Sequence, residues 1–181
     1  LEHLKRELLF LGGLVEEAVN KAIDALMDRR LELAQEVLEG DDAIDAKEVQ
    51  VEEDCLKSLA LHQPVAADLR FLVSVLKVTN DLERMGDIAG NIAERASYLA
   101  VHEPLKVSLD FRAMGDRVRA MVRDSLDALV RLDTALARRV QQADDVVDAM
   151  NRQMFDVLEG LMQKDPSTVK RALHALSSSR H

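Results

Sequence analysis

The chain has 181 residues, of which 48% are hydrophobic and 3% aromatic, and it contains no Trp and three Pro. A chain of this length can bury a substantial core, and this composition is typical of a helix bundle rather than of a sheet protein. The formal net charge is −9, which argues against a nucleic-acid-binding surface because phosphate backbones are bound by basic stripes.

Neither a membrane span nor a secretory leader is visible in the sequence. No apolar run approaches the roughly 18 residues that cross a bilayer, and the first residues lack a signal-peptide pattern. Cys55 is the single cysteine, so an internal disulfide is excluded and a reducing compartment is favoured. We therefore expect a cytoplasmic protein that does not insert into a membrane.

Apolar residues at helical spacing predict the first helices in chain order. The stripe from Leu4 to Ala25 predicts a helix that ends near Arg29. Residues 31–38 predict a short helix that Gly40 terminates. Asp41 or the residue after it then caps a second helix, which runs to about residue 61.

The longest uninterrupted apolar stripe lies within residues 69–99 and predicts one long helix, with Pro64 in its first turn. Its members alternate at spacings of four and three: Phe71, Val75, Val78, Leu82, Met85, Ala89, Ile92, Ala96 and Leu99. The polar stripe that contains Glu83 and Asp87 is expected on the opposite, outward face. Gly86 and Gly90 flank this pair, and each glycine costs a helix about 1 kcal/mol relative to Ala. We expect them to admit a neighbouring backbone or to leave space around a bound ion.

The pattern restarts after Pro104. An offset of 103 aligns residues 14–50 with 117–153 without a gap, and 13 of the 37 positions are identical. The matches include an acidic cluster, in which Asp41, Asp42 and Asp45 pair with Asp144, Asp145 and Asp148. The alignment predicts a fourth and a fifth helix and a sixth that begins near residues 165–166. Because the sequence ends before the counterpart of Glu83, we expect the sixth helix to be clipped.

Two acidic ladders are the candidate functional residues. Glu83 and Asp87 lie one helical turn apart, a spacing at which two carboxylates can share a hard cation. Asp41, Asp45, Glu48 and Glu52 form a second ladder at spacings of four, three and four. A solvated helix face is the alternative interpretation, since surface helices are normally polar on their outer side.

Three sequence segments together resemble the PhoU family of phosphate-transport accessory regulators. They are HQPVAADLR at 62–70, NDLERMGD at 80–87 followed by NIAE at 91–94, and two Asp-Asp-x-x-Asp segments at 41–45 and 144–148. The resemblance covers nearly the whole chain. It implies an all-α fold of two tandem antiparallel three-helix bundles, here residues 1–103 and an incomplete 104–181, and commonly a homodimer.

The resemblance also implies a function. PhoU-like proteins act beside the phosphate ABC transporter in the bacterial cytoplasm. They are negative regulators of phosphate uptake that link the transporter ATPase subunit to a sensor histidine kinase. Members of the family hold metal ions, iron among them, on acidic surface motifs, and zinc is a further candidate here. Those motifs correspond to Glu83 with Asp87, Asp41 with Asp45, and Asp144 with Asp148.

An enzyme is the alternative function. A carboxylate-bridged metalloenzyme, such as a phosphatase, could use the same acidic ladders for two-metal chemistry. The five histidines occupy predicted helix ends or isolated positions, and neither the Glu-x-x-His pairs of di-iron bundles nor the His-Glu-x-x-His motif of zinc hydrolases is present. We therefore expect a regulator without catalytic activity.

Overall fold

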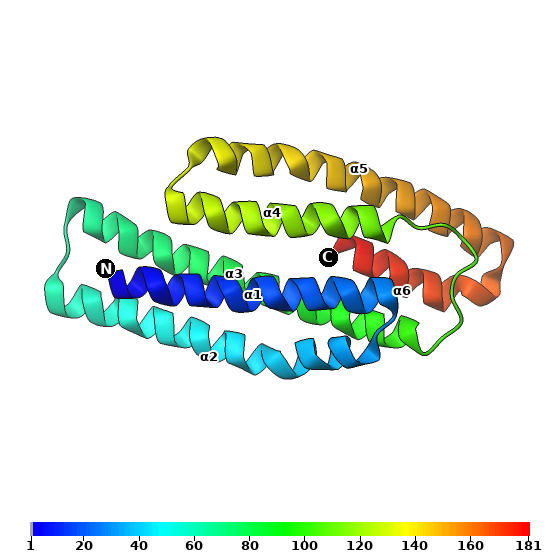
Figure 1. Cartoon of the computed structure of the whole chain (residues 1–181), viewed down its shortest axis with the longest axis horizontal. Helices are drawn as coiled ribbons and strands as arrows, with labels where there is room; N and C mark the ends of the chain where they lie inside the picture. Colours follow the sequence, from blue (N-terminus) through cyan, green and yellow to red (C-terminus); the bar gives the residue numbers. More distant parts are fainter. Residues whose placement is uncertain (1) are drawn as a thin grey trace.

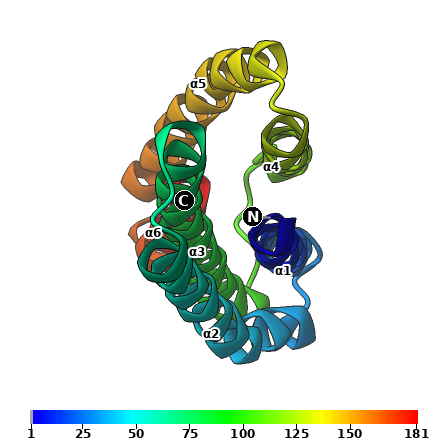
Figure 2. The ribbon, with the colours of Figure 1, turned by 90° about the vertical axis from the view of Figure 1, so that its left-hand side faces the viewer.

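A computed structural model describes residues 2–181, and its regular elements are all helical (Figure 1). Their order is α1 (Glu2–Asp28), α2 (Leu31–His62), α3 (Ala66–Ala100), α4 (Phe111–Arg131), α5 (Thr134–Lys164), a short 3-10 helix η1 (Pro166–Thr168) and α6 (Val169–Arg180). All the α-helices run along the long axis of the molecule, and α1 lies between the α2–α3 pair and α4 (Figures 1 and 2). Within residues 2–181 no helix is both long enough and apolar enough to cross a membrane.

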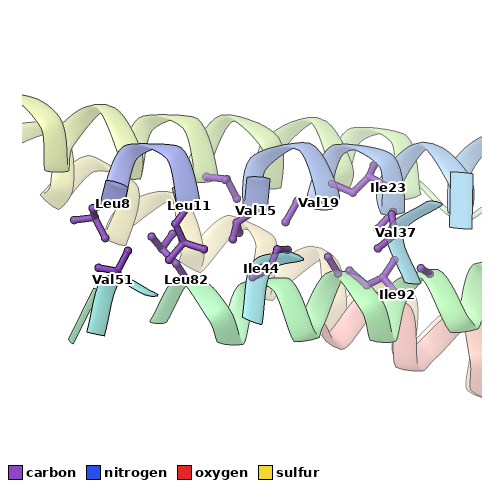
Figure 3. Packing of buried hydrophobic residues seen from close by; sticks show 14 of the residues in the cluster. Leu8, Leu11, Val15, Val19, Ile23, Val37, Ile44, Val51, Leu82 and Ile92 are labelled. Carbon is purple, nitrogen blue, oxygen red and sulfur yellow. The ribbon is translucent and has the colours of Figure 1, made fainter. Parts of the chain in front are cut away.

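The main hydrophobic core lies among α1, α2 and α3. The stripe predicted on α1 is buried, and it faces Val37, Ile44 and Val51 of α2 and Leu82 and Ile92 of α3 (Figure 3). Three amphipathic helices that each turn one stripe inward bury far more apolar surface than any pair would. The predicted extent of α1 is confirmed, because the helix continues through both of its glycines.

The predicted break at Gly40 is wrong. The helix α2 is continuous from Leu31 to His62, so Gly40 is an interior residue and Asp41 caps nothing. The buried residues on either side of the glycine belong to one seam: Ala34, Val37, Ile44, Val51 and Cys55. Because this single seam packs on α1 and α3, its tertiary contacts outweigh the roughly 1 kcal/mol that an interior glycine costs.

The predicted long helix is confirmed as α3. Its buried line passes through Leu72, Val75, Thr79, Leu82, Gly86, Ala89, Ile92, Ala93 and Ala96, while the predicted members Phe71, Val78, Met85 and Leu99 are only half-buried. The apolar stripe is wider than predicted because α1 and α2 both pack against this helix. Pro64 precedes the helix instead of occupying its first turn.

The helices α4 and α5 bury fewer residues than the first three. Asp110 and Asp133 cap their N-termini by accepting hydrogen bonds from Ala113 N and Leu136 N. Only Met154 and Leu158 of α5 are buried. The predicted start of the sixth helix is confirmed, since Asp165 caps η1 and α6 follows directly.

Two glycines join α1 to α4 in a reciprocal manner. A Cβ on Gly12 of α1 would lie 2.8 Å from Leu126 Cδ2, and a Cβ on Gly115 of α4 would lie 2.6 Å from Ile23 Cγ2. The two glycines are 103 positions apart, and so are Ile23 and Leu126. Each helix therefore inserts an aliphatic side chain into the glycine notch of the other, and a pseudo-twofold axis relates the two contacts.

Candidate functional site

Six carboxylates border the seam between α2 and α3, and we call this group the acidic face. Its members are Asp41, Asp45, Glu48 and Glu52 of α2 and Glu83 and Asp87 of α3. The buried residues of α2 follow helical spacing except at two positions, where a carboxylate replaces the expected apolar residue. Asp41 lies between Val37 and Ile44. Glu48 lies between Ile44 and Val51. Both are half-buried for that reason, although a charged side chain normally avoids such a position.

Gly86 allows the two halves of the acidic face to meet. A Cβ at this position would lie 3.1 Å from both Cδ1 and Cγ2 of Ile44, which is tighter than an ordinary contact. The glycine therefore lets α2 and α3 approach closely, and Glu83 and Asp87 come to lie beside the α2 carboxylates. The expectation that they look directly outward is only half right: Asp87 is exposed, whereas Glu83 is half-buried. Gly90 meets open space.

Burial and neighbouring carboxylates raise the pKa values of three members of the acidic face, Asp41, Glu48 and Glu83. Burial, then Asp45 and Asp87, raise the pKa of Asp41. Burial and the charges of Asp87, Glu48 and Asp45 raise the pKa of Glu83, and the pKa of Glu48 is raised in the same way. Each shift follows from the cost of placing like charges together at a site with reduced access to water.

Among the described residues, no basic side chain forms an ion pair with these six carboxylates. The ion pairs of residues 2–181 all involve carboxylates outside the acidic face. Carboxylate oxygens are the ligands that hard cations prefer, so the chemistry of this donor set fits a metal ion. Nevertheless, within residues 2–181 no three carboxylate, imidazole or thiolate groups converge closely enough to hold one. A bound ion would therefore require side-chain rotations, which are easiest at the exposed Asp45 and Asp87.

The second predicted pair, Asp144 and Asp148, lies in different surroundings. Both residues are exposed on α5, and the Asp148 carboxylate lies 3.9 Å from the Arg152 guanidinium. They border a hollow of about 260 Å³ whose lining is largely apolar. The neighbouring α6 contains no Asp or Glu. In the part of the chain that the structure describes, this pair thus has no counterpart of Glu83 and Asp87 facing it.

Glu48 is a member of the acidic face that the pairwise motif omits. The signal was present in the sequence, because the ladder of α2 continues at a spacing of three from Asp45 to Glu48. The motif consists of two carboxylates four residues apart in one helix, so it does not include Glu48. The acidic face, in contrast, combines carboxylates from two helices.

Comparison with known proteins identifies the family. The family model described as the PhoU domain matches twice, over residues 8–96 and 111–181. The phosphate-specific transport system accessory protein PhoU homolog of Aquifex aeolicus is 43% identical over 181 residues, which span 100% of this chain and 82% of that protein.

Two crystal structures share the fold. PhoU from Pseudomonas aeruginosa superposes with a TM-score of 0.95 at 39% identity, covering 99% of this chain and 86% of the other. The phosphate transport system regulatory protein PhoU from Streptococcus pneumoniae gives a TM-score of 0.91 at 29% identity, covering 99% and 84%. With its two domain matches and these relatives along its full length, the chain belongs to the PhoU family.

Proposed function

We propose that this chain is an accessory regulator of phosphate-specific transport that works by binding and not by catalysis. The names of its relatives support a regulatory role in phosphate-specific transport. One is named an accessory protein of that transport system, and another is named a regulatory protein. The acidic face is the observation that carries the second part, binding without catalysis. It is a set of six carboxylates on two long helices, and in the described part of the chain none of them forms an ion pair.

In this proposal the chain restrains phosphate uptake and phosphate-starvation signalling in the cytoplasm. Its partners are the ATPase subunit of a phosphate ABC transporter and a sensor histidine kinase, and it acts as a homodimer. Such a protein needs surfaces that two partners can dock on. The extended side of a helix bundle offers these without a closed cavity.

A metal ion on the acidic face is part of the proposal. Asp41, Asp45, Glu83 and Asp87 would hold iron, zinc or another cation, and Asp144 with Asp148 would provide a second, weaker position. A bound cation would supply positive charge to a surface that otherwise repels anions. The protein's own residues position that charge at the α2–α3 seam, where a carboxylate or phosphoryl group of a partner can approach.

Metal content tests this part directly. We expect plasma mass spectrometry of the purified chain to find close to a whole number of metal ions per chain. The Glu83→Gln, Asp87→Asn double variant is expected to lose that metal, because it removes two of the four ligands on the acidic face. The Asp156→Asn, Glu159→Gln variant is the matched control, since it removes the same charge from exposed residues of α5 that belong to neither proposed metal position. Equal metal content in the wild type and the Glu83–Asp87 variant would contradict a site on α3.

Phosphate uptake tests the regulatory role. In a bacterium that lacks its own homologue, expression of the chain is expected to lower phosphate uptake and starvation-reporter expression when phosphate is plentiful. The Glu83→Gln, Asp87→Asn variant is expected to restrain uptake less at an equal protein level. Uptake that is the same with and without the chain would contradict the proposal. So would the release of phosphate from a phosphate ester by the purified protein at an enzymatic rate.

A further inference from the structure

The seam between α3 and α6 carries a group of polar and basic side chains that the acidic face does not explain. We call it the basic seam, and it comprises Arg95, Tyr98 and His102 on one side and Lys170, His174 and Ser177 on the other. Each set follows helical spacing, with steps of three and four in one case and of four and three in the other. Side chains at these steps share one face of a helix. His102 lies just beyond the C-terminal end of α3 and stacks on Tyr98, so the two sets face each other across the seam.

Tyr98 is the centre of the basic seam. Its ring stacks on His102 with centroids 3.9 Å apart and on His174 with centroids 3.8 Å apart. The Lys170 ammonium lies 5.2 Å from the Tyr98 centroid. On the same seam, Arg95 Nε donates to Ser177 Oγ at 3.4 Å. Three basic groups therefore surround one aromatic ring, and Arg95 lies on the same seam beside Ser177.

The charge of the basic seam is unusual in a chain of net charge −9. Burial together with the charges of Arg95, Lys170 and His102 lowers the pKa of His174, and no carboxylate acts on it. Two acids lie at the flanks of the basic seam. Glu94 Oε2 is 3.6 Å from the Arg95 guanidinium, and Glu103 Oε2 is 3.8 Å from that of Arg171. Two permanent cations and two imidazoles therefore meet with little negative charge between them.

The hydrogen bonds of the imidazoles indicate which nitrogens face outward. His102 Nδ1 lies 2.7 Å from the Tyr98 carbonyl oxygen, and because a carbonyl only accepts, this nitrogen carries the proton. His174 Nδ1 is shut off from solvent and has no hydrogen-bond partner among the described residues. The nitrogen that His174 can offer to a ligand is therefore Nε2.

We propose that the basic seam binds a small tetrahedral oxyanion, of the class of sulfate and inorganic phosphate, between α3 and α6. The Arg95 guanidinium and the Lys170 ammonium supply charge and donors, and the Ser177 hydroxyl and protonated His174 complete the set. Charge-assisted hydrogen bonds from such donors are the usual way in which proteins hold phosphate and sulfate groups. Because donors come from both helices, the anion would also tie α6 to the end of α3.

The proposal has a defined pH dependence. A bound dianion offsets the cations that disfavour protonation of His174, so the pKa of this imidazole is higher with the anion bound than without it. At a pH between these two pKa values, binding of the anion is coupled to the uptake of one proton by His174. Affinity therefore rises as pH falls through that interval and levels off once His174 is protonated in the free protein as well.

Calorimetric titration of the purified chain with sulfate tests the site. Sulfate stays a dianion between about pH 5 and 8, so any pH dependence belongs to the protein. Chloride at equal ionic strength is the reference titrant. We expect Lys170→Ala to weaken sulfate binding about fivefold or more, the loss of one charge-assisted hydrogen bond. Lys164→Ala is the matched control because it removes an exposed lysine from the last turn of α5, and it is expected to leave the affinity unchanged.

A second variant and a second anion complete the test. His174→Gln is expected to bind sulfate with little dependence on pH, and inorganic phosphate is expected to compete with sulfate in the wild type. Equal heats with chloride and sulfate would overturn the proposal. An equal loss of affinity in Lys164→Ala would do the same, because it would indicate general screening of charge. The basic seam and the acidic face share no residue, so this outcome is independent of metal binding and of phosphate uptake.

Discussion

At the scale of single residues, the acidic face makes a stability contribution that depends on pH. The pKa values of Asp41, Glu48 and Glu83 are raised in the folded protein. Between the ordinary and the raised values, the folded state therefore binds more protons than the unfolded chain does. Stability then falls as pH rises through this interval, and the repulsion is fully present above it.

Removal of one of these charges is expected to stabilise the protein. We expect Glu83→Gln to increase the free energy of unfolding by about 0.3 kcal/mol at pH 7 and low ionic strength, because it relieves like-charge repulsion. Urea denaturation measures the change. The gain should vanish when the carboxylates are protonated and shrink in high salt. Glu94→Gln on the same helix is the control, since the Glu94 carboxylate lies 3.6 Å from Arg95 and its loss should not stabilise.

The glycines give a second prediction at this scale. Gly115→Ala is expected to destabilise by about 1–3 kcal/mol, because the new Cβ would lie 2.6 Å from Ile23 Cγ2, an atom fixed close to the α1 backbone. Gly40→Ala is the opposite case. Gly40 is inside α2 with nothing within 4 Å of an added Cβ, so the gain in helix propensity of about 1 kcal/mol should appear. Thermal unfolding of the two variants should give shifts of opposite sign.

At the scale of elements, Arg29 stabilises the C-terminal end of α3. This residue lies in the turn between α1 and α2 and donates to the carbonyl oxygens of Ala100, at 3.3 Å, and of His102. The last carbonyls of a helix have no partner within the helix, and a cation there also meets the negative end of the helix dipole. Arg29 therefore joins the start of α2 to the end of α3 although the two are far apart in sequence.

Loss of this cap is expected to cost about 1 kcal/mol of unfolding free energy in Arg29→Ala. Hydrogen exchange should show the loss as faster exchange at the end of α3. The neighbouring variant Arg30→Ala is the control, because Arg30 is exposed and its side chain makes no cap hydrogen bond. Equal effects of the two substitutions would mean that Arg29 acts only through its charge.

The elements also show how far sequence reasoning reaches in this protein. The extents of α1 and α3 were predictable because their apolar stripes are unbroken. The break at Gly40 was predicted wrongly. Glycine is a local signal for the end of a helix, but here the packing of one continuous buried seam on α1 and α3 outweighs it, and that packing is not visible in the sequence. For the acidic face, each ladder was predictable from spacing. The closeness of Glu83 to Glu48 depends on the packing of Gly86 against Ile44. The glycine indicated that a neighbour approaches this position, but the sequence does not identify that neighbour as Ile44 of α2.

At the scale of the whole molecule, burial is uneven between the two repeats. The main core draws on α1, α2 and α3, whereas α5 buries only Met154 and Leu158. Segments with few buried apolar contacts open at lower free energy than the global unfolding of a protein. We therefore expect amides of α5 to exchange with solvent faster than those of α2 in mass-spectrometric hydrogen exchange. The two helices have 31 and 32 residues, so length does not bias the comparison. Equal protection would indicate that the molecule opens as one unit.

The reciprocal contacts of Gly12 and Gly115 bear on the ancestry of the chain. A surface that fits its own copy across a twofold axis is what a homodimer of one repeat would use. Duplication and fusion of such a repeat would turn an association that depends on concentration into a permanent one at high effective concentration. After such a fusion the two copies would be free to diverge. The present repeats differ at the ion pair between Arg119 and Asp24, because the position equivalent to Arg119 in the first repeat is Glu16. The symmetry-equivalent positions are Glu16 and Asp127, two acids that cannot form an ion pair. This contact therefore distinguishes the first repeat from the second.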